Sequence, residues 1–185
     1  MTPGKKGPKS SAIDLLILGM LIDRPQSAYD LASFVESKHL NMVLKVSAPA
    51  IYKNCKRLHA DQLLEASVSR SGDLPEKVTY RINDKGRAHF YQLMAHYSQE
   101  MRPFHFEHNS FLWNLEKMPK EEGLVMLSHL QTSLVALKNW ISAHEKEVEK
   151  MGAFGPLALA RQYRMVFQAL VRWIKSVIKD YQTLK

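Results

Sequence analysis

The stretch KVSAPAIYKNCKRLHADQLLEASVSR, residues 45–70, holds a helix signal followed by a strand signal. In its first part Ile51, Cys55 and Leu58 recur at spacings of four and three residues, which places them on one side of a helix. We predict a helix over residues 47–61 with this apolar side buried. The segment LLEASVSR that follows tends to alternate in polarity, so the chain changes there from helix to strand.

A second alternating segment completes a hairpin. SGDLPE at 71–76 supplies turn residues between LLEASVSR and KVTYRI at 77–82, and together they predict two antiparallel strands. Upstream, LLILGMLI and AYDLASFVESK predict two short helices, each preceded by a serine that lies three residues before an aspartate. Asn83 can cap the helix after the hairpin, and this helix should end before Pro103. Three helices followed by a two-stranded wing predict a winged helix-turn-helix.

Composition and charge narrow the possible functions. The 185 residues are 45% hydrophobic, enough for a buried core, and their longest apolar run is too short to span a bilayer, so we expect no membrane partner. Cys55 is the only cysteine, which excludes an internal disulfide and favours the cytoplasm as the compartment. The formal net charge of +8 permits a polyanionic partner without identifying one. Residues 1–10 are expected to form a disordered basic arm.

Catalytic and metal-binding patterns are weak. His105 and His108 have helical spacing, but no convincing third ligand accompanies them, so we predict no metal and read the histidines as surface or core residues. We find no nucleophile motif, glycine-rich phosphate loop or carboxylate pair in a persuasive setting. We therefore predict neither an enzyme nor a bound cofactor.

The outward side of the predicted third helix is basic. No acid occurs between Lys45 and Asp61, whereas an ordinary solvated helix carries charges of both signs, and phosphate contacts favour lysine and arginine over acids. In a helix-turn-helix the second helix of the pair enters the major groove of double-stranded DNA. The residues that we expect to contact DNA are Ser47, Pro49, Tyr52, Lys53, Lys56 and Arg57 on the helix and Arg70 and Lys77 on the wing.

The second half of the chain is predicted to be helical. Pro119 suits the first turn of a long helix that reaches about Lys150 and carries a heptad seam, and a final helix begins near Leu157 with two adjacent apolar stripes. The preceding long helix can cover one of the two stripes, so we expect the other stripe to contact a second protomer. The alternative is that the helix after the wing covers this second stripe within the chain. The predicted dimerisation residues are Leu134, Leu137, Ile141, Phe167, Leu170, Val171, Trp173 and Ile174.

Aromatic residues are dense near the junction of the two halves. They can line a pocket for a small aromatic effector, or they can form core between domains, and the sequence favours neither. The candidate effector-binding residues are Tyr97, Phe104, His108 and Trp113.

Three segments together resemble a known family. ILGMLIDRPQSAYDLASFVE, SAPAIYKNCKRLHADQLLE and GDLPEKVTYRINDKGR are similar, in order and spacing, to the signatures of PadR-like transcriptional regulators, over about residues 12 to 90. The resemblance implies a dimeric bacterial winged-helix regulator of a two-fold operator, usually a repressor, and some members release DNA on binding small aromatic molecules. It further implies that Tyr52 meets the DNA backbone, that Lys56 and Arg57 form the basic pair of the helix, and that Lys77 is the wing base.

Three positions depart from the family pattern. Ala28 stands where glycine is usual, which a helix tolerates well. Gln62 stands where glycine commonly ends the recognition helix, so the turn either carries a strained left-handed residue or closes differently. Cys55 replaces a usual leucine and leaves less volume in the core.

We therefore predict a mostly α protein with an N-terminal winged helix-turn-helix and a C-terminal helical dimerisation domain. The expected divisions are the arm at 1–10, the DNA-binding domain with its linker helix at 11–102, and the dimerisation and effector domain at 103–185. The predicted function is a homodimeric, sequence-specific repressor of the cytoplasm and nucleoid that a small aromatic effector releases from DNA. The alternative is a protein-interaction scaffold whose winged helix no longer binds DNA.

Overall fold

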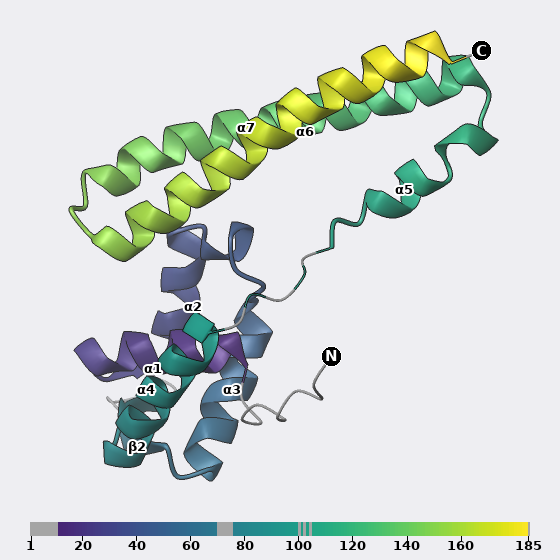
Figure 1. Cartoon of the computed structure of the whole chain (residues 1–185). Coiled ribbons are helices and arrows are strands. Elements are labelled where there is room, and N and C mark those ends of the chain that lie inside the picture. The colour runs from purple at the N-terminus through teal and green to yellow at the C-terminus, as the bar shows by residue number, and fades with distance from the viewer. Residues whose placement is uncertain (1–10, 70–75, 100, 102, 104, 185) are drawn as a thin grey trace. The chain divides into compact units, whose positions relative to one another are not determined.

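The computed structural model describes residues 11–69, 76–99, 101, 103 and 105–184 (Figure 1). The chain divides into two compact units, Met1–Pro103 and Phe104–Lys185, and each is described by itself. The predicted arm at 1–10 lies outside the described residues. No helix in the described part of the chain is long and apolar enough to cross a membrane.

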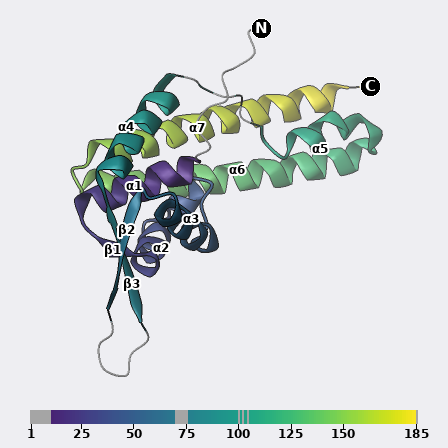
Figure 2. The same cartoon turned by 90° about the horizontal axis from the view of Figure 1, so that it is seen from below.

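The first unit is a winged helix-turn-helix, as predicted. Helices α2 and α3 form the helix-turn-helix pair, and the β2–β3 hairpin projects beyond them as the wing (Figure 2). In chain order the elements are α1 (Ala12–Asp23), β1 (Gln26–Ser27), α2 (Ala28–Ser37), the short 3-10 helix η1 (Leu40–Met42), α3 (Ala48–Ala60), β2 (Leu64–Ser69), β3 (Lys77–Ile82) and α4 (Asp84–Gln99).

The sheet has three strands instead of the two predicted. Strand β3 pairs antiparallel with β2 from Leu64 opposite Ile82 to Ser69 opposite Lys77, and its other edge pairs with β1. Strand β1 contains only two residues, too few to form an alternating pattern that could be recognised in the sequence. Its pairing fixes the base of the wing to the start of α2.

The starts of α2 and α4 follow the capping pattern read from the sequence, whereas the hydroxyl of Ser11, the predicted cap of α1, makes no capping bond. The Ser27 hydroxyl accepts a hydrogen bond from the backbone N–H of Asp30 at 3.1 Å, and the Asp30 carboxylate accepts one from the Ser27 N–H at 3.2 Å. Asn83 caps α4, as predicted, because its side-chain oxygen accepts a hydrogen bond from the Gly86 N–H at 2.9 Å.

Gly86 also permits a close approach between α4 and the turn after α3. A Cβ atom at this position would lie 2.2 Å from the backbone oxygen of Leu63 and 2.8 Å from a side-chain carbon of Ile82. Because a backbone oxygen cannot move aside as a flexible side chain does, only glycine fits here.

One core fills the space between the helices and the sheet. It joins residues of α1, α2, α3, β2, β3 and α4, which are almost fully buried: Ile17, Leu18, Leu21, Leu31, Val35, Ile51, Cys55, Leu58, Leu64, Tyr80, Ile82 and Leu93. Burial raises the pKa of the Cys55 thiol to about 12, so this cysteine is a small core residue and not a reactive thiol.

The turn after α3 carries a left-handed residue. Gln62 has φ of 59°, and the N–H groups of Gln62 and Leu63 donate to the carbonyls of His59 and Leu58, each at 2.9 Å. These two bonds define a Schellman motif, in which the left-handed position usually holds glycine. Of the two outcomes left open by the sequence, the protein keeps the usual turn and accepts the strained residue.

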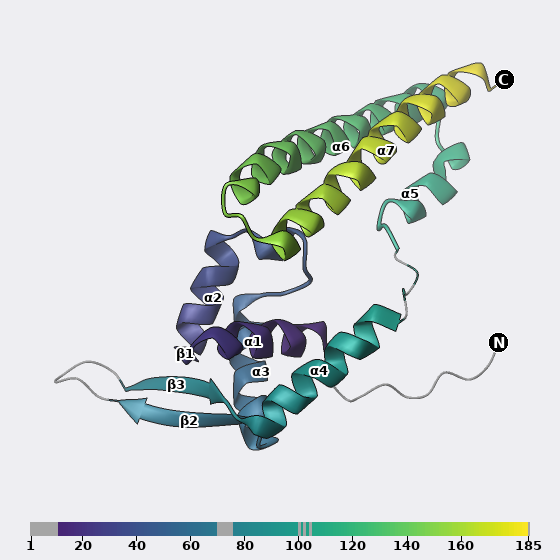
Figure 3. The ribbon, with the colours of Figure 1, turned by 60° about the vertical axis from the view of Figure 1, so that its left-hand side comes forward.

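The second unit consists mainly of two long antiparallel helices that lie side by side (Figure 3). They are α6 (Lys120–Glu149) and α7 (Phe154–Thr183), and before them come the short α5 (Asn109–Trp113) and the 3-10 helix η2 (Leu115–Lys117). Helix α7 begins three residues before the predicted start at Leu157, with Pro156 in its first turn, where proline is tolerated.

The packing of α6 on α7 uses half of the predicted dimerisation residues. Leu134 and Ile141 of α6 and Val171 and Ile174 of α7 are buried within the chain. These four side chains therefore stabilise the helical hairpin itself. The remaining four are only partly buried: Leu137, Phe167, Leu170 and Trp173.

The left-handed turn predicts an unusual stabilising substitution. Gln62→Gly should increase the free energy of unfolding by about 0.5 kcal/mol, because a glycine removes a steric cost of ~1 kcal/mol that its greater entropy in the unfolded chain offsets in part. Gln62→Val should lower it by more than 1 kcal/mol, since β-branched residues tolerate this region worst. Urea unfolding of the three proteins measures both changes, and equal stabilities would contradict the strain at this turn.

The buried thiol predicts slow chemical modification. At pH 8 a group with a pKa of about 12 is thiolate in only about one molecule in 10⁴, and the side chain is also inaccessible. A thiol reagent such as DTNB should label Cys55 within minutes in 6 M guanidinium chloride but only at the rate of global opening in native buffer. Rapid labelling of the native protein would show that the core around α3 opens readily.

Candidate nucleic-acid interface

Helix α3 presents one basic side to solvent. Its residues Ile51, Cys55 and Leu58 face the core, as predicted, and the opposite side exposes Tyr52, of which 41% is accessible. The other exposed residues on this side are Pro49, Lys53, Lys56, His59 and Ala60. The positions 49, 52, 53, 56, 59 and 60 follow the helical repeat, so they form one continuous surface.

The first turn of α3 adds backbone donors to this surface. Ser47 is the N-cap residue with extended backbone angles, Pro49 lies in the first turn, and no acidic residue occurs there. The exposed Ser47 hydroxyl makes no capping bond, so the N–H groups of this turn are open to an anion.

Arg57 does not point outward as expected. Its guanidinium contacts the buried carboxylate of Asp14 in α1, and it also bonds Asp61 Oδ2 at 3.0 Å. About a third of the side chain, 36%, remains accessible. The spacing within α3 places Arg57 at the edge of the exposed side, and a partner that lies 43 residues earlier draws it toward the core.

The base of the wing pairs with the helix-turn-helix. The Lys77 ammonium lies 3.1 Å from Asp30 Oδ2, and both groups are partly exposed. The pKa of Asp30 is lowered by the hydrogen bond from Ser27 and, more weakly, by Lys77, so the carboxylate stays charged at more acidic pH than an ordinary aspartate. Arg70, the other predicted wing contact, lies outside the described residues.

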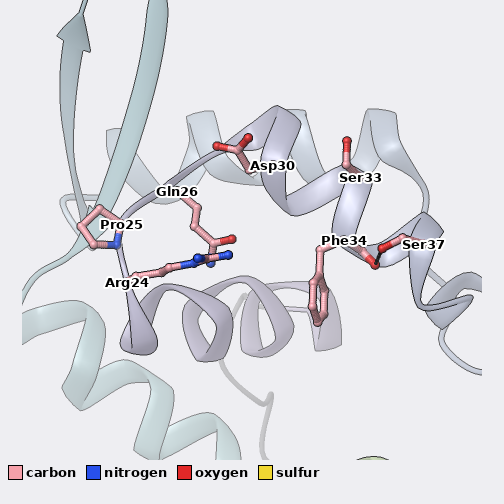
Figure 4. Close-up of a pocket in the computed structure, with 7 residues that line it drawn as sticks. All are labelled: Arg24, Pro25, Gln26, Asp30, Ser33, Phe34 and Ser37. Carbon is pink, nitrogen blue, oxygen red and sulfur yellow. Dashed lines mark hydrogen bonds between the residues drawn. The ribbon is translucent and has the colours of Figure 1, made fainter. Parts of the chain in front are cut away.

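An open pocket beside the wing was not predicted. It has a volume of about 540 Å³ and is lined by residues of the α1–α2 connection and of α2 (Figure 4): Arg24, Pro25, Gln26, Asp30, Ser33, Phe34 and Ser37. The Gln26 amide donates to the carbonyl of Met20 at 3.0 Å, which fixes one wall. Arg24 is exposed and lines this pocket together with Asp30. No periodic pattern in the sequence marks this pocket, since its residues meet only through the turn between the helices.

The predicted effector residues fall in different units. Tyr97 belongs to α4 of the first unit, where its ring contacts His96, and Phe104 lies outside the described residues. In the second unit the His108 ring stacks on Phe106 with centroids 5.1 Å apart and lies 5.9 Å from Trp173. Trp113 is 86% exposed. An effector pocket formed by these residues stays a prediction.

Metal ligands do not gather anywhere in the described ranges. Within residues 11–69, 76–99 and 105–184, no three side chains of histidine, cysteine, aspartate or glutamate lie close enough to hold a metal ion.

Comparison with known proteins agrees with the fold. Residues 17–92 match the family model of the transcriptional regulator PadR-like family, and no curated protein matches the chain. Among solved structures, Bacillus subtilis PadR in complex with operator DNA is similar with a TM-score of 0.79 and 15% identity, covering 94% of this chain and 99% of that one.

Two further structures share the fold. Bacillus subtilis PadR in complex with p-coumaric acid has a TM-score of 0.74 and 15% identity. The alignment covers 93% of this chain and 99% of that one. The PadR-like transcriptional regulator BC1756 from Bacillus cereus has a TM-score of 0.68 and 17% identity. The alignment covers 92% of this chain and 98% of that one. Residues 17–92 thus match the PadR-like transcriptional regulator family model, and the whole chain has the fold of solved PadR regulators.

Proposed function

We propose that this protein is a sequence-specific DNA-binding transcriptional regulator in which α3 enters the major groove. The observation that carries the proposal is the exposed side of α3, where Tyr52, Lys53 and Lys56 stand together without an acid. Lysines there neutralise phosphates and supply affinity, while the side chains nearest the base edges supply selectivity. The open N–H groups behind Ser47 suit a further phosphate.

The wing supplies a second contact in this proposal. Lys77 pairs with Asp30 in the free protein, and both groups are accessible enough for a phosphate to compete for the lysine. An exposed ion pair is worth little, so the exchange costs little free energy. Arg70, which lies outside the described residues, is proposed as a further DNA contact.

A homodimer is the proposed assembly. Leu137, Phe167, Leu170 and Trp173 remain partly exposed on the α6–α7 hairpin, and a second copy that covers them would form a two-fold interface. Two α3 helices about 34 Å apart would then meet successive major grooves of a two-fold operator. A dimer held on a promoter excludes the polymerase, so we propose repression as its action in the cytoplasm.

A small aromatic effector is proposed to release the DNA. A solved structure of the same fold holds p-coumaric acid, and the rings of Phe106, His108 and Trp173 offer this chain a stacking surface for such a ligand. Binding that favours a dimer with the wrong spacing would lower DNA affinity by population shift.

The α3 surface predicts how variants respond to salt. The test uses a DNA duplex that the protein enriches from a random pool. Lys56→Ala should reduce the salt slope, the steepness with which log K falls against the logarithm of the KCl concentration, by about 2, because each protomer of the dimer loses one phosphate contact. Tyr52→Ala should weaken binding about tenfold with little change in slope, because it carries no charge. Fluorescence anisotropy between 50 and 300 mM KCl measures both.

Lys146→Ala is the matched control, since it removes an exposed helical lysine from the second unit and should leave affinity and slope unchanged. Wild-type affinity and slope in both α3 variants would contradict the recognition-helix assignment. Failure of the wild type to enrich any duplex would favour the interaction-scaffold alternative.

The effector proposal predicts ligand-dependent release from DNA. Titration with p-coumaric acid and related aromatic acids should lower operator affinity at least fivefold in the wild type, and His108→Ala should reduce this response because it removes the central ring of the stack. Sedimentation of the same samples should show a dimer with and without ligand. Operator affinity that stays constant across the titration would argue against release by aromatic acids.

A further inference from the structure

Asp14 is a buried carboxylate held from two directions. It is 0% exposed, one oxygen accepts a hydrogen bond from the Ser11 N–H at 2.8 Å, and the other accepts one from Arg57 Nη2. A buried carboxylate without a cationic partner is strongly unfavourable, so the position of Asp14 requires the Arg57 guanidinium beside it.

Arg57 is occupied by these structural contacts. Besides Asp14, its guanidinium donates to Asn54 Oδ1 at 3.1 Å and to Asp61 Oδ2 at 3.0 Å. Asn54 lies one turn before it in α3 and Asp61 is the residue that caps the end of α3, whereas Asp14 lies in the first turn of α1. The side chain therefore ties the second half of α3 to the start of another helix.

The hydrogen bond between Arg57 and Asp14 depends on direction, whereas the apolar packing of α3 does not. Ile51, Cys55 and Leu58 bury apolar surface, and apolar contacts tolerate small rotations of a helix because the hydrophobic effect has no preferred direction. A charge-assisted hydrogen bond requires one arrangement of guanidinium and carboxylate. Lys56 precedes Arg57 in the chain, so a rotation of α3 that broke the pair would also turn Lys56 and Tyr52 away from their present direction.

We propose that Arg57 and Asp14 are positioning residues of the DNA interface. Together they fix the rotation of α3 about its axis, and Arg57 is not itself a phosphate ligand. This inference rests on the proposed DNA-binding function, and it assigns Arg57 a role different from the one expected of a basic pair with Lys56.

The experiment compares Asp14→Asn, Arg57→Gln and the double variant at a temperature where melting curves show all of them folded. The ratio of specific to non-specific affinity should fall at least fivefold in each single variant, although Asp14 is too buried to touch DNA. The salt slope of specific binding should stay at the wild-type value in Arg57→Gln. The double variant should lose no more than the worse single variant, because the two residues act as one unit.

Asp61→Asn is the matched control, since it removes an exposed partner of the same guanidinium and leaves the link to α1 intact. The ratio of specific to non-specific affinity in Asp61→Asn should equal that of the wild type. Two results together would overturn the proposal: a salt slope reduced by about 2 in Arg57→Gln, and an unchanged ratio of specific to non-specific affinity in Asp14→Asn. They would show that Arg57 contacts a phosphate directly.

Hydrogen exchange separates this inference from the proposed function. Amides of α3 should exchange faster in Asp14→Asn and Arg57→Gln than in the wild type, with or without DNA, if the pair holds the helix. Unchanged exchange would refute the positioning role even if the wild type binds DNA. A wild type that binds no duplex selectively would refute the proposed function, whatever the exchange rates.

Discussion

Burial of one side of α3 is the constraint on which the rest of the first unit depends. Ile51, Cys55 and Leu58 are almost inaccessible, and the full burial of an isoleucine or leucine side chain contributes on the order of 1.5–3 kcal/mol. Turning the helix over would expose all three and bury lysines. The core therefore selects the exposed side of α3, and the surface proposed to contact DNA follows from packing that never touches DNA.

The ion pairs add a second level of control to that surface. Of the four basic residues predicted to contact DNA in the described part of the chain, Lys53 and Lys56 are exposed on α3, while Arg57 and Lys77 each bind an acid from α1 or α2. The two pairs differ in burial. Asp14 is enclosed, so its pair with Arg57 is structural, whereas the accessible Asp30–Lys77 pair can exchange for a phosphate at small cost.

Local patterns in the sequence predicted local structure well. Apolar periodicity located α2, α3 and both wing strands, a continuous apolar run located α1, and serine and asparagine residues marked where helices begin. Gln62 was recognised as an anomaly because one position in a helix-ending turn has a strong preference for glycine. Contacts between distant segments were missed for a physical reason: the Asp14–Arg57 pair and the pairing of β1 with β3 each join residues more than 40 positions apart, and no repeat in the chain records them.

The second unit illustrates the same limit for the predicted dimerisation residues. Heptad spacing predicted that α6 has an apolar seam and that α7 has two stripes, but spacing alone does not assign a stripe to a partner. Two packed helices have one shared interface, so a helix with two stripes keeps one of them outside it. Here Val171 and Ile174 enter the hairpin core, and Leu170 and Trp173 stay partly exposed beside them. In the proposed dimer, a second copy would bring the same apolar patch from both sides and cover the parts of these side chains that the chain itself leaves exposed.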